Sequence, residues 1–278
     1  MTTVLRAAAV SLFAVSLAAA APAFAQAEKK FEPQVGQPGK VVIWVPTPDE
    51  VVDRMLTMAQ IGPGDFHMDL GSGDGKIVIA AAKRGARSLG IEYNPDMVKL
   101  AQENAQKAGV AGRASFRRAD IFQTDFSRAT VITLYLLPAL NMKLRPQLLQ
   151  MKPGTRVVSH SFTMEDWEPD EVSSIDGRRV YFWVVPANVM GTWSLDFGGP
   201  QTELTLEQTF QKINGWVTLG AVHGGLRDAR LSGADIAFSY VDDKSVRRDF
   251  TGKVSDRQMS GTFRDPTGAE GRWSATKK

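Results

Sequence analysis

Between residues 41 and 187, the apolar positions switch repeatedly between the spacing of a strand and that of a helix. Short apolar runs predict strands at 66–70, 86–92, 114–118, 130–136 and 155–161. Helical spacing between these runs predicts helices at 48–59, 76–84, 95–108 and 140–150. Strands that alternate with helices build a parallel sheet that binds ligands at the carboxyl ends of its strands. We therefore expect a doubly wound α/β domain over residues 41–187.

The first of these helices has a start signal in the sequence. Thr47 is predicted as the N-cap, Pro48 as the first helical residue and Glu50 as the partner that completes a capping box. The helix is expected to end at the glycine- and proline-rich segment 62–64.

After Pro186 the pattern changes to short alternating segments separated by turns. Segments of this kind, spaced by roughly 8–12 residues, predict about eight strands and no helix. We expect residues 188–278 to form a small all-β antiparallel domain, either a barrel or a sandwich. Its opening, Gly191-Thr192-Trp193, resembles that of lipocalin-like barrels. Two roles stay open: a module for stability or docking, or a barrel that binds a peptide or apolar ligand and delivers substrate.

The N-terminal segment has the pattern of a signal peptide. Arg6 precedes a small and apolar run, Pro22 breaks it, and Ala23-Phe24-Ala25 fits a signal-peptidase site. We expect residues 1–25 to be removed and the mature chain to be exported to a periplasm, with residues 26–40 as a linker. The alternative is an uncleaved segment that anchors the protein in the membrane, because the apolar run is almost long enough to span a bilayer.

Composition narrows the chemistry. The chain has 278 residues, a net charge of +3, no cysteine and three histidines. The absence of cysteine excludes a thiol nucleophile, a disulfide and a Cys-ligated metal. The histidines have no spacing that suggests a metal site, so we expect no metal. Basic residues form no stripe along the chain, and we expect no nucleic-acid partner.

A glycine-rich turn follows the first predicted strand. Asp69-Leu70 leads into Gly71-Ser72-Gly73-Asp74-Gly75, where the glycines allow a tight turn and close approach to a ligand. Lys76 stands where a dinucleotide fingerprint requires a third glycine. The carboxylates of Asp69 and Asp74 would repel a pyrophosphate and favour a cationic sulfonium or ammonium. The simpler interpretation is a strand–helix turn without a ligand.

Two further carboxylates favour a ligand. Glu92, at the end of the second strand and followed by Tyr93 and Asn94, can accept hydrogen bonds from both hydroxyls of a ribose. Asp120, at the end of the third strand and followed by Ile121, can accept one from an adenine amino group. All these residues are therefore candidates for cofactor binding.

This combination of motifs resembles the class I S-adenosylmethionine-dependent methyltransferases. A narrower similarity is to the lysine N-methyltransferases, above all the mitochondrial enzymes that modify the ATP synthase c-subunit and the adenine nucleotide translocator. It rests on Val45-Pro46-Thr47-Pro48, on residues 69–82 and 90–95, and on Trp167-Glu168-Pro169-Asp170. The resemblance covers about half of the chain and ends near Ala187.

The resemblance implies a Rossmann-like methyltransferase sheet, S-adenosyl-L-methionine as cofactor and methyl transfer to a protein lysine. It further implies that Pro46 and Thr47 close over the methionine part of the cofactor. Tyr135, with Asn141 nearby, would form the acceptor wall, unless they are a core tyrosine and a helix cap. Asp166 and Trp167 would shape the acceptor channel, unless the tryptophan serves packing.

The motif at the end of the fourth strand, Tyr135-Leu136-Leu137-Pro138, departs from the Asn/Asp-Pro-Pro-Tyr motif of enzymes that methylate adenine or glutamine. Nucleobases and glutamine are therefore disfavoured as acceptors. We expect an exported or membrane-tethered methyltransferase that acts on protein lysine. A small-molecule methyltransferase is one alternative, and a non-enzymatic exported binding protein with the same fold is another.

Overall fold

The computed structural model describes residues 2, 31–36, 44–199, 202–242 and 244–278. The predicted signal peptide over 1–25 lies outside the described residues apart from residue 2, as does much of the predicted linker over 26–40. In the described part of the chain, every helix is too short or too polar to cross a bilayer.

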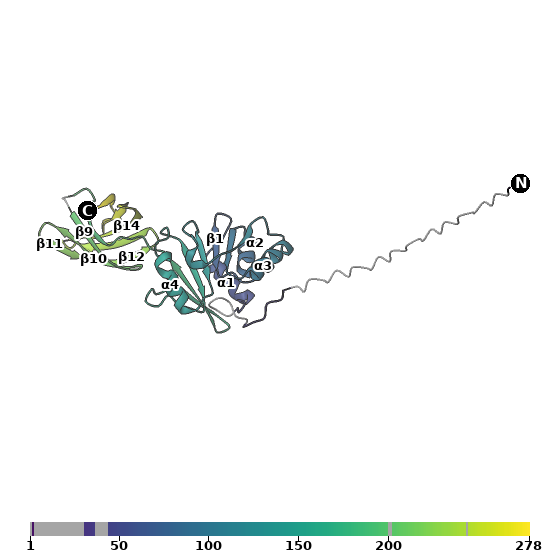
Figure 1. The fold of residues 1–278 in the computed structure, drawn as a ribbon. Coiled ribbons are helices and arrows are strands. Elements are labelled where there is room, and N and C mark those ends of the chain that lie inside the picture. The colour runs from purple at the N-terminus through teal and green to yellow at the C-terminus, as the bar shows by residue number, and fades with distance from the viewer. Residues whose placement is uncertain (1, 3–30, 37–43, 200–201, 243) are drawn as a thin grey trace. The chain divides into compact units, whose positions relative to one another are not determined.

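The first sheet has seven strands in the order β3-β2-β1-β4-β5-β7-β6 (Figure 1). The five strands on one side pair in parallel, whereas β7 is antiparallel to both β5 and β6. The strands are β1 (Phe66–Leu70), β2 (Arg87–Glu92), β3 (Ala114–Arg118), β4 (Val131–Leu134), β5 (Arg156–His160), β6 (Glu171–Ile175) and β7 (Arg178–Val184).

Helices cover both faces of this sheet because its central strands are apolar on both sides. On β4, Val131 packs with the core of one face and Ile132 with the core of the other. The helices on the Val131 face are α1 (Asp49–Met58), α2 (Lys76–Lys83) and α3 (Pro95–Lys107). The opposite face is covered by α4 (Pro138–Leu148). A short 3₁₀ helix, η1 (Ile121–Gln123), follows β3. The predicted doubly wound α/β sheet is confirmed.

One local prediction is wrong, and one hairpin was missed. Pro48, not Thr47, occupies the N-cap position of α1, and no side chain caps that helix. The Thr47 hydroxyl lies instead 3.2 Å from His160 Nδ1. The hairpin of β6 and β7 was not predicted, because β6 is polar and largely exposed at the sheet edge and so lacks an alternating apolar signal.

The second sheet has nine antiparallel strands in the order β11-β10-β9-β8-β16-β15-β14-β13-β12. Because β12 also lies beside β10, and β11 beside β13, the sheet curls nearly into a barrel (Figure 1). The strands are β8 (Gly191–Asp196), β9 (Thr202–Thr209), β10 (Lys212–Leu219), β11 (Val222–Gly225), β12 (Arg227–Ser232), β13 (Asp235–Val241), β14 (Arg247–Ser255), β15 (Gln258–Arg264) and β16 (Glu270–Lys277). The predicted all-β architecture is confirmed.

Aromatic side chains fill the inside of the second sheet. Phe238 stacks on Phe250 with ring centroids 4.9 Å apart, and Trp273 makes a T-shaped contact with each of them. The indole of Trp193 is fully buried and donates its N–H to Val189 O at 2.8 Å. The interior of this sheet therefore has a packed aromatic core.

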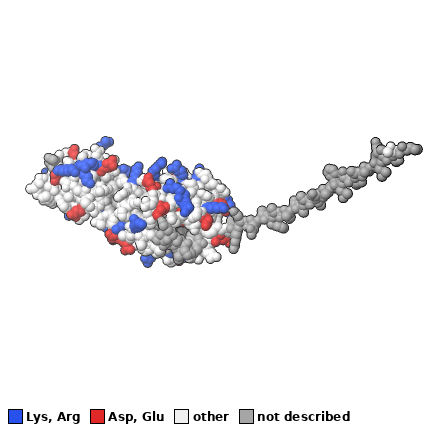
Figure 2. All heavy atoms as spheres, in the orientation of Figure 1, with Lys and Arg blue, Asp and Glu red and all other residues white. Residues whose placement is uncertain are grey.

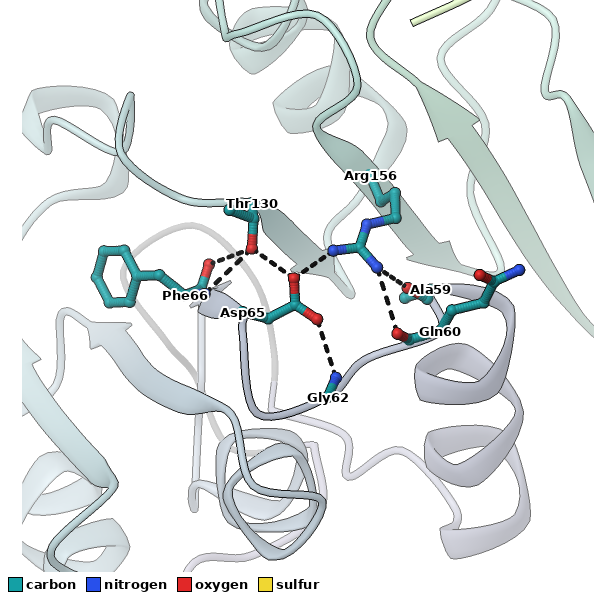
Figure 3. Close-up of polar contacts among 7 residues, drawn as sticks. All are labelled: Ala59, Gln60, Gly62, Asp65, Phe66, Thr130 and Arg156. Atoms are coloured by element: carbon teal, nitrogen blue, oxygen red, sulfur yellow. Dashed lines mark hydrogen bonds and ion pairs between the residues drawn. The ribbon is translucent and has the colours of Figure 1, made fainter.

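A polar cluster ties together the amino-terminal ends of β1, β4 and β5 (Figure 3). The Asp65 carboxylate accepts hydrogen bonds from Thr130 Oγ1 at 2.8 Å and from Gly62 N at 2.9 Å, and it pairs with the Arg156 guanidinium. Arg156 also donates to Ala59 O at 2.6 Å, just after α1. This cluster therefore lies at the amino-terminal ends of the strands. The ligand is expected at the opposite, carboxyl ends.

Candidate active site

A cavity of about 480 Å³ opens at the carboxyl ends of the parallel strands. This is the edge at which doubly wound sheets bind their ligands. Most residues that the sequence singled out line it, namely Pro46, Thr47, Asp69, Gly71, Ser72, Gly73, Glu92, Tyr93, Asn94, Asp120, Ile121 and Tyr135. Four do not line it, namely Gly75, Asn141, Asp166 and Trp167. The assignment of the lining residues to the cofactor stays a prediction.

The glycine-rich turn brings the backbone to the cavity wall. Gly71 N and Ser72 N both donate to Ile91 O, at 2.8 and 3.0 Å, so the turn is fastened to the end of β2. Gly73 has a φ of +52°, and a Cβ there would lie 2.8 Å from the Trp44 indole nitrogen. Trp44 belongs to the segment before α1 and also lines the cavity. Only glycine leaves room for both the turn and this indole.

Gly75 lies behind the cavity wall. It is the N-cap of α2, with a φ of +85°. A Cβ at this position would lie 2.7 Å from the Phe116 ring and 2.9 Å from Ala101. Its absent side chain thus permits close packing of α2 against the sheet and α3, and Gly75 does not line the cavity.

The Glu92 carboxylate is held by backbone donors from two segments. Its Oε2 accepts from Gly73 N at 3.1 Å, and its Oε1 accepts from Asn94 N at 2.8 Å. A carboxylate oxygen can accept more than one hydrogen bond, so both oxygens retain capacity for a ligand. The arrangement fits a carboxylate that accepts from two neighbouring hydroxyls.

Asp69 is buried at the base of the cavity. Burial raises the pKa of its carboxyl to about 7, although the hydrogen bond from Thr133 Oγ1 at 2.7 Å opposes the shift. Because Thr133 gives its only proton to Asp69, it must accept one from His67 Nε2, which lies at 2.8 Å. Burial lowers the pKa of His67 to about 3, so the ring is neutral and its Nδ1 accepts from Ser88 Oγ at 3.3 Å.

At the adenine end of the predicted cofactor site, a hydrogen bond holds the carboxylate of Asp120 in place. Asp120 caps η1 and accepts from Phe122 N at 2.9 Å. The Lys143 ammonium of α4 lies 3.9 Å from the centre of the Phe122 ring. Phe122 and Lys143 line the cavity but were not predicted, because neither belongs to a recognisable motif.

Together these groups fit S-adenosylmethionine. Four carboxylates line the cavity, Asp69, Asp74, Glu92 and Asp120, whereas a dinucleotide pyrophosphate would need the opposite charge. The buried Ser72 Oγ has no hydrogen-bond partner among the described residues and lines the same cavity, so it is free to bond a ligand.

An aromatic wall stands at the end of β4 and β5. The half-buried Tyr135 ring lies 4.0 Å from that of His160 and 6.2 Å from that of Phe162, measured between centroids. Burial and the charge of Arg178 lower the pKa of His160 to about 4, so its ring is neutral at physiological pH. Sequence reasoning missed His160 and Phe162, although their place at the end of a predicted strand was a signal for both.

Asn141 is neither an acceptor contact nor a helix cap. It is fully buried inside α4, and its amide donates to Ser159 Oγ at 3.3 Å and to two backbone oxygens, Phe162 O at 3.4 Å and Thr163 O at 3.3 Å. Asn141 therefore fixes the backbone of the segment after β5, which carries Phe162 of the aromatic wall.

The predicted roles of Asp166 and Trp167 in the acceptor channel are also corrected. Neither residue lines the cavity. Trp167 is fully buried, and Asp166 pairs with Arg145. The tryptophan thus serves packing, as one of the two interpretations had it.

The cavity therefore joins an acidic end to an aromatic and apolar end. The apolar end is lined by Tyr135, Leu137, Leu140 and Phe162. No cluster of three potential metal ligands occurs among the residues that the structure describes. Such a cavity can hold a cation-bearing nucleoside beside an acceptor, which suits a group transfer that depends on positioning.

Comparison with known proteins supports this interpretation. Residues 69–171 match the model of the ANTKMT methyltransferase domain. The chain is 43% identical over 151 residues to a protein-lysine N-methyltransferase of Saccharolobus islandicus, a match of 52% of this chain and 94% of the relative. It is 31% identical over 180 residues to the mouse lysine N-methyltransferase of the ATP synthase c-subunit, a match of 59% of this chain and 72% of the relative.

A solved structure is also similar. It is the RNA methyltransferase from Salinibacter ruber in complex with S-adenosyl-L-homocysteine, with 54% identity and a TM-score of 0.51. The match covers 52% of this chain and 96% of that chain.

Proposed function

Because this chain belongs to the ANTKMT methyltransferase family of S-adenosylmethionine-dependent enzymes, we propose that it methylates the ε-amino group of a protein lysine. The observation that carries the proposal is the 43% identity to a protein-lysine N-methyltransferase over 94% of that enzyme's length. The cavity supports it, since an aromatic, apolar pocket adjoins the acidic site.

Different residues of the chain are assigned to different parts of the cofactor. S-adenosylmethionine supplies a methyl group on a sulfonium, which is already a good leaving group. We assign the ribose hydroxyls to Glu92, the adenine amino group to Asp120 and the amino-acid ammonium to the region of Asp69. Thr47 and Pro46, which line the same cavity, are assigned to the methionine part.

The acceptor lysine must be neutral to attack the methyl group. An apolar lining disfavours a charged ammonium and lowers the pKa of an amine that enters it. Tyr135, Leu137 and Phe162 supply such a lining, with the Tyr135 ring supported from behind by His160. These residues would desolvate the amine and hold it in line, with no separate base required.

RNA is the second candidate acceptor, because the Salinibacter ruber protein is described as an RNA methyltransferase. Two observations favour protein instead. Tyr135-Leu136-Leu137-Pro138 lacks the Asn/Asp-Pro-Pro-Tyr motif of adenine-methylating enzymes. On the face drawn in Figure 2, acidic side chains lie among the basic ones, so the basic groups form no continuous stripe for a phosphate backbone.

Labelling separates the candidate acceptors. The purified full chain is incubated with S-adenosyl-[methyl-³H]methionine and a cell extract, and the label is followed after protease or ribonuclease digestion. We expect macromolecular label that protease removes and ribonuclease leaves. Ribonuclease-sensitive label would establish RNA. Label that passes an ultrafilter before digestion and separates by chromatography from S-adenosylmethionine would establish a small molecule. A reaction without the purified chain supplies the background, and Glu92→Ala should lower the label toward it.

The location of the enzyme is a separate proposal. The pattern of residues 1–25 supports export with cleavage after Ala25. Amino-terminal sequencing of the protein from a bacterial host that expresses the full chain should then begin at Gln26. An intact N-terminus on a membrane-bound protein would establish the anchored alternative.

A further inference from the structure

The segment between β5 and β6, residues 161–170, contributes one residue, Phe162, to the acceptor end of the cavity. We call this segment the acceptor loop. Ser161 and Glu165 have φ values of +65° and +56°, which non-glycine residues adopt only when their surroundings hold them there. Directly after Ser161, Phe162 lines the cavity. The position of the Phe162 ring therefore depends on what holds this loop.

The first sheet and its helices hold the loop from one side. Asn141 donates to the backbone of Phe162, as described above, and Arg145 donates to Met164 O at 2.9 Å. Trp183 of β7 donates its indole N–H to Trp167 O at 2.8 Å. These contacts leave the Trp167 indole N–H and the Glu168 carbonyl to be satisfied from elsewhere.

The second sheet supplies those partners from the turn between β9 and β10. Gln211 Oε1 accepts from Trp167 Nε1 at 3.1 Å. Gln211 Nε2 donates to Glu168 O at 2.7 Å and to Asp170 Oδ1 at 3.2 Å. One side chain thus bonds three residues of the acceptor loop.

The neighbours of Gln211 strengthen the contact. The Phe210 ring stacks on Trp167 with centroids 6.1 Å apart, and the Arg145 guanidinium lies 5.4 Å from the same ring. Lys212 Nζ lies 2.6 Å from Glu168 Oε2. Phe210 has a φ of +54°, so the turn itself is held in a special conformation. A fully buried Trp167 would lose its N–H partner without Gln211.

We infer that the second sheet, through Phe210 and Gln211, fixes the acceptor loop and thereby the acceptor end of the cavity. The inference rests on the proposed function, because it assigns residues to the acceptor side of that site. Phe210 and Gln211 are positioning residues, since they act through Trp167 and the loop. The all-β part is then a component of acceptor selection, while cofactor binding depends on the first sheet.

The test uses full-length Phe210→Ala and Gln211→Ala. Gln258→Ala is the matched control, because Gln258 follows the comparable turn after β14, where Asp256 has a φ of +50°, and is exposed. Phe210→Tyr is the conservative variant that keeps the ring. Hydrogen exchange of the amides of 162–168, calorimetric titration with S-adenosylhomocysteine, and the dependence of methyl transfer on extract concentration are measured on each.

We expect loop amides in Phe210→Ala and Gln211→Ala to exchange about tenfold faster, with a higher half-saturating extract concentration and a Kd for S-adenosylhomocysteine within about twofold of wild type. Phe210→Tyr and Gln258→Ala should match wild type. Unchanged exchange, or a parallel loss of S-adenosylhomocysteine binding, would overturn the inference. If wild type labels no protein, the exchange data still decide the positioning claim, so failure of the proposed function remains distinguishable.

Discussion

The Glu92 carboxylate links the glycine-rich turn to the end of β2, and Glu92 lines the cavity. Replacing it with alanine removes the acceptors of Gly73 N and Asn94 N as well as those offered to a ribose. We expect S-adenosylhomocysteine binding in Glu92→Ala to weaken by roughly 1–3 kcal/mol, measured by calorimetry. Glu207→Ala, an exposed glutamate on β9, is the control and should bind like wild type. Equal affinities in both variants would place the cofactor elsewhere.

A second substitution tests the close approach at Gly73. Valine at a positive φ costs roughly 1–3 kcal/mol wherever it is placed. At Gly73 it also strikes the Trp44 indole, whereas at Gly109, with a φ of +70°, a Cβ meets nothing within 4 Å. Gly73→Val should therefore raise the Kd for S-adenosylhomocysteine by more than about tenfold, and Gly109→Val should leave it unchanged. Similar affinities would show that the indole is not part of the site.

The buried Asp69 predicts how affinity depends on pH. Its raised pKa of about 7 means that the carboxyl is neutral below that pH and ionised above it. A ligand with an ammonium group prefers the ionised form, so the affinity for S-adenosylhomocysteine should fall by up to about tenfold per pH unit below pH 7 and level off above it. Titrations between pH 5.5 and pH 8.5, values chosen to be about 1.5 units on either side, check this.

The Asp69→Asn variant is the control for that dependence. Asparagine keeps the size but cannot ionise, so its affinity should not vary over the same range. The sign for folding is opposite: a folded pKa above the ordinary 3.8 makes the native state bind more protons between pH 3.8 and about 7. The contribution of Asp69 to the free energy of unfolding therefore decreases as pH rises through that window. A wild-type affinity that is flat with pH would remove Asp69 from the ammonium site.

Among the helices and strands, those with strong apolar periodicity were predictable from the sequence. The strands β1 to β5 and the helices between them follow the pattern closely, because a sheet buried on both faces imposes it. The polar edge strand β6 imposes no such pattern. At Thr47 a tertiary contact prevailed over the usual preference of threonine for the N-cap. Its hydroxyl contacts His160 of β5 instead of capping α1. The sequence around Thr47 does not reveal this contact, because His160 is far away in the chain.

In the candidate site, too, features set by the local sequence were predictable and features set by tertiary contacts were not. Residues that act through a motif, such as Asp69, Gly73 and Glu92, were found, because turn geometry and charge are local properties. Asn141 was assigned to the acceptor wall, but burial inside α4 directs its amide to the backbone of the acceptor loop. Phe162 was missed, since its place in the cavity depends on that same loop.

The polar cluster at the amino-terminal edge of the sheet predicts a change in stability without a change in binding. In Arg156→Ala, Asp65 loses a charge-assisted hydrogen bond in a site where its side chain is only 12% exposed. We expect a loss of about 1.5–3 kcal/mol in the free energy of unfolding, measured with urea, and an unaltered Kd for S-adenosylhomocysteine.

The matched comparison for Arg156→Ala is Arg247→Ala, which breaks exposed ion pairs with Asp228 and Asp249. Because such pairs are screened by water, this variant should unfold almost like wild type. A weaker Kd in Arg156→Ala would mean that the two edges of the sheet are coupled.

For the molecule as a whole, we propose two domains, residues 41–187 and 188–278, that both contribute to the acceptor side of the proposed methyl transfer. The family match ends at residue 171, before the second sheet, whereas the β9–β10 turn contacts the acceptor loop inside the matched region. The sequence could predict an all-β part but not this contact, because Gln211 belongs to no motif. Its position is fixed only when both sheets have folded.

Lysine methylation is tested most directly by amino-acid analysis of the labelled protein. The protein fraction labelled by the full chain with S-adenosyl-[methyl-³H]methionine is hydrolysed in acid and separated by chromatography beside methylated amino-acid standards. We predict that the label elutes with Nε-methylated lysine and decreases when Glu92→Ala replaces the wild type at a cofactor concentration below saturation. Label that elutes with another methylated amino acid, or a protein fraction without label, would contradict lysine methylation by this chain.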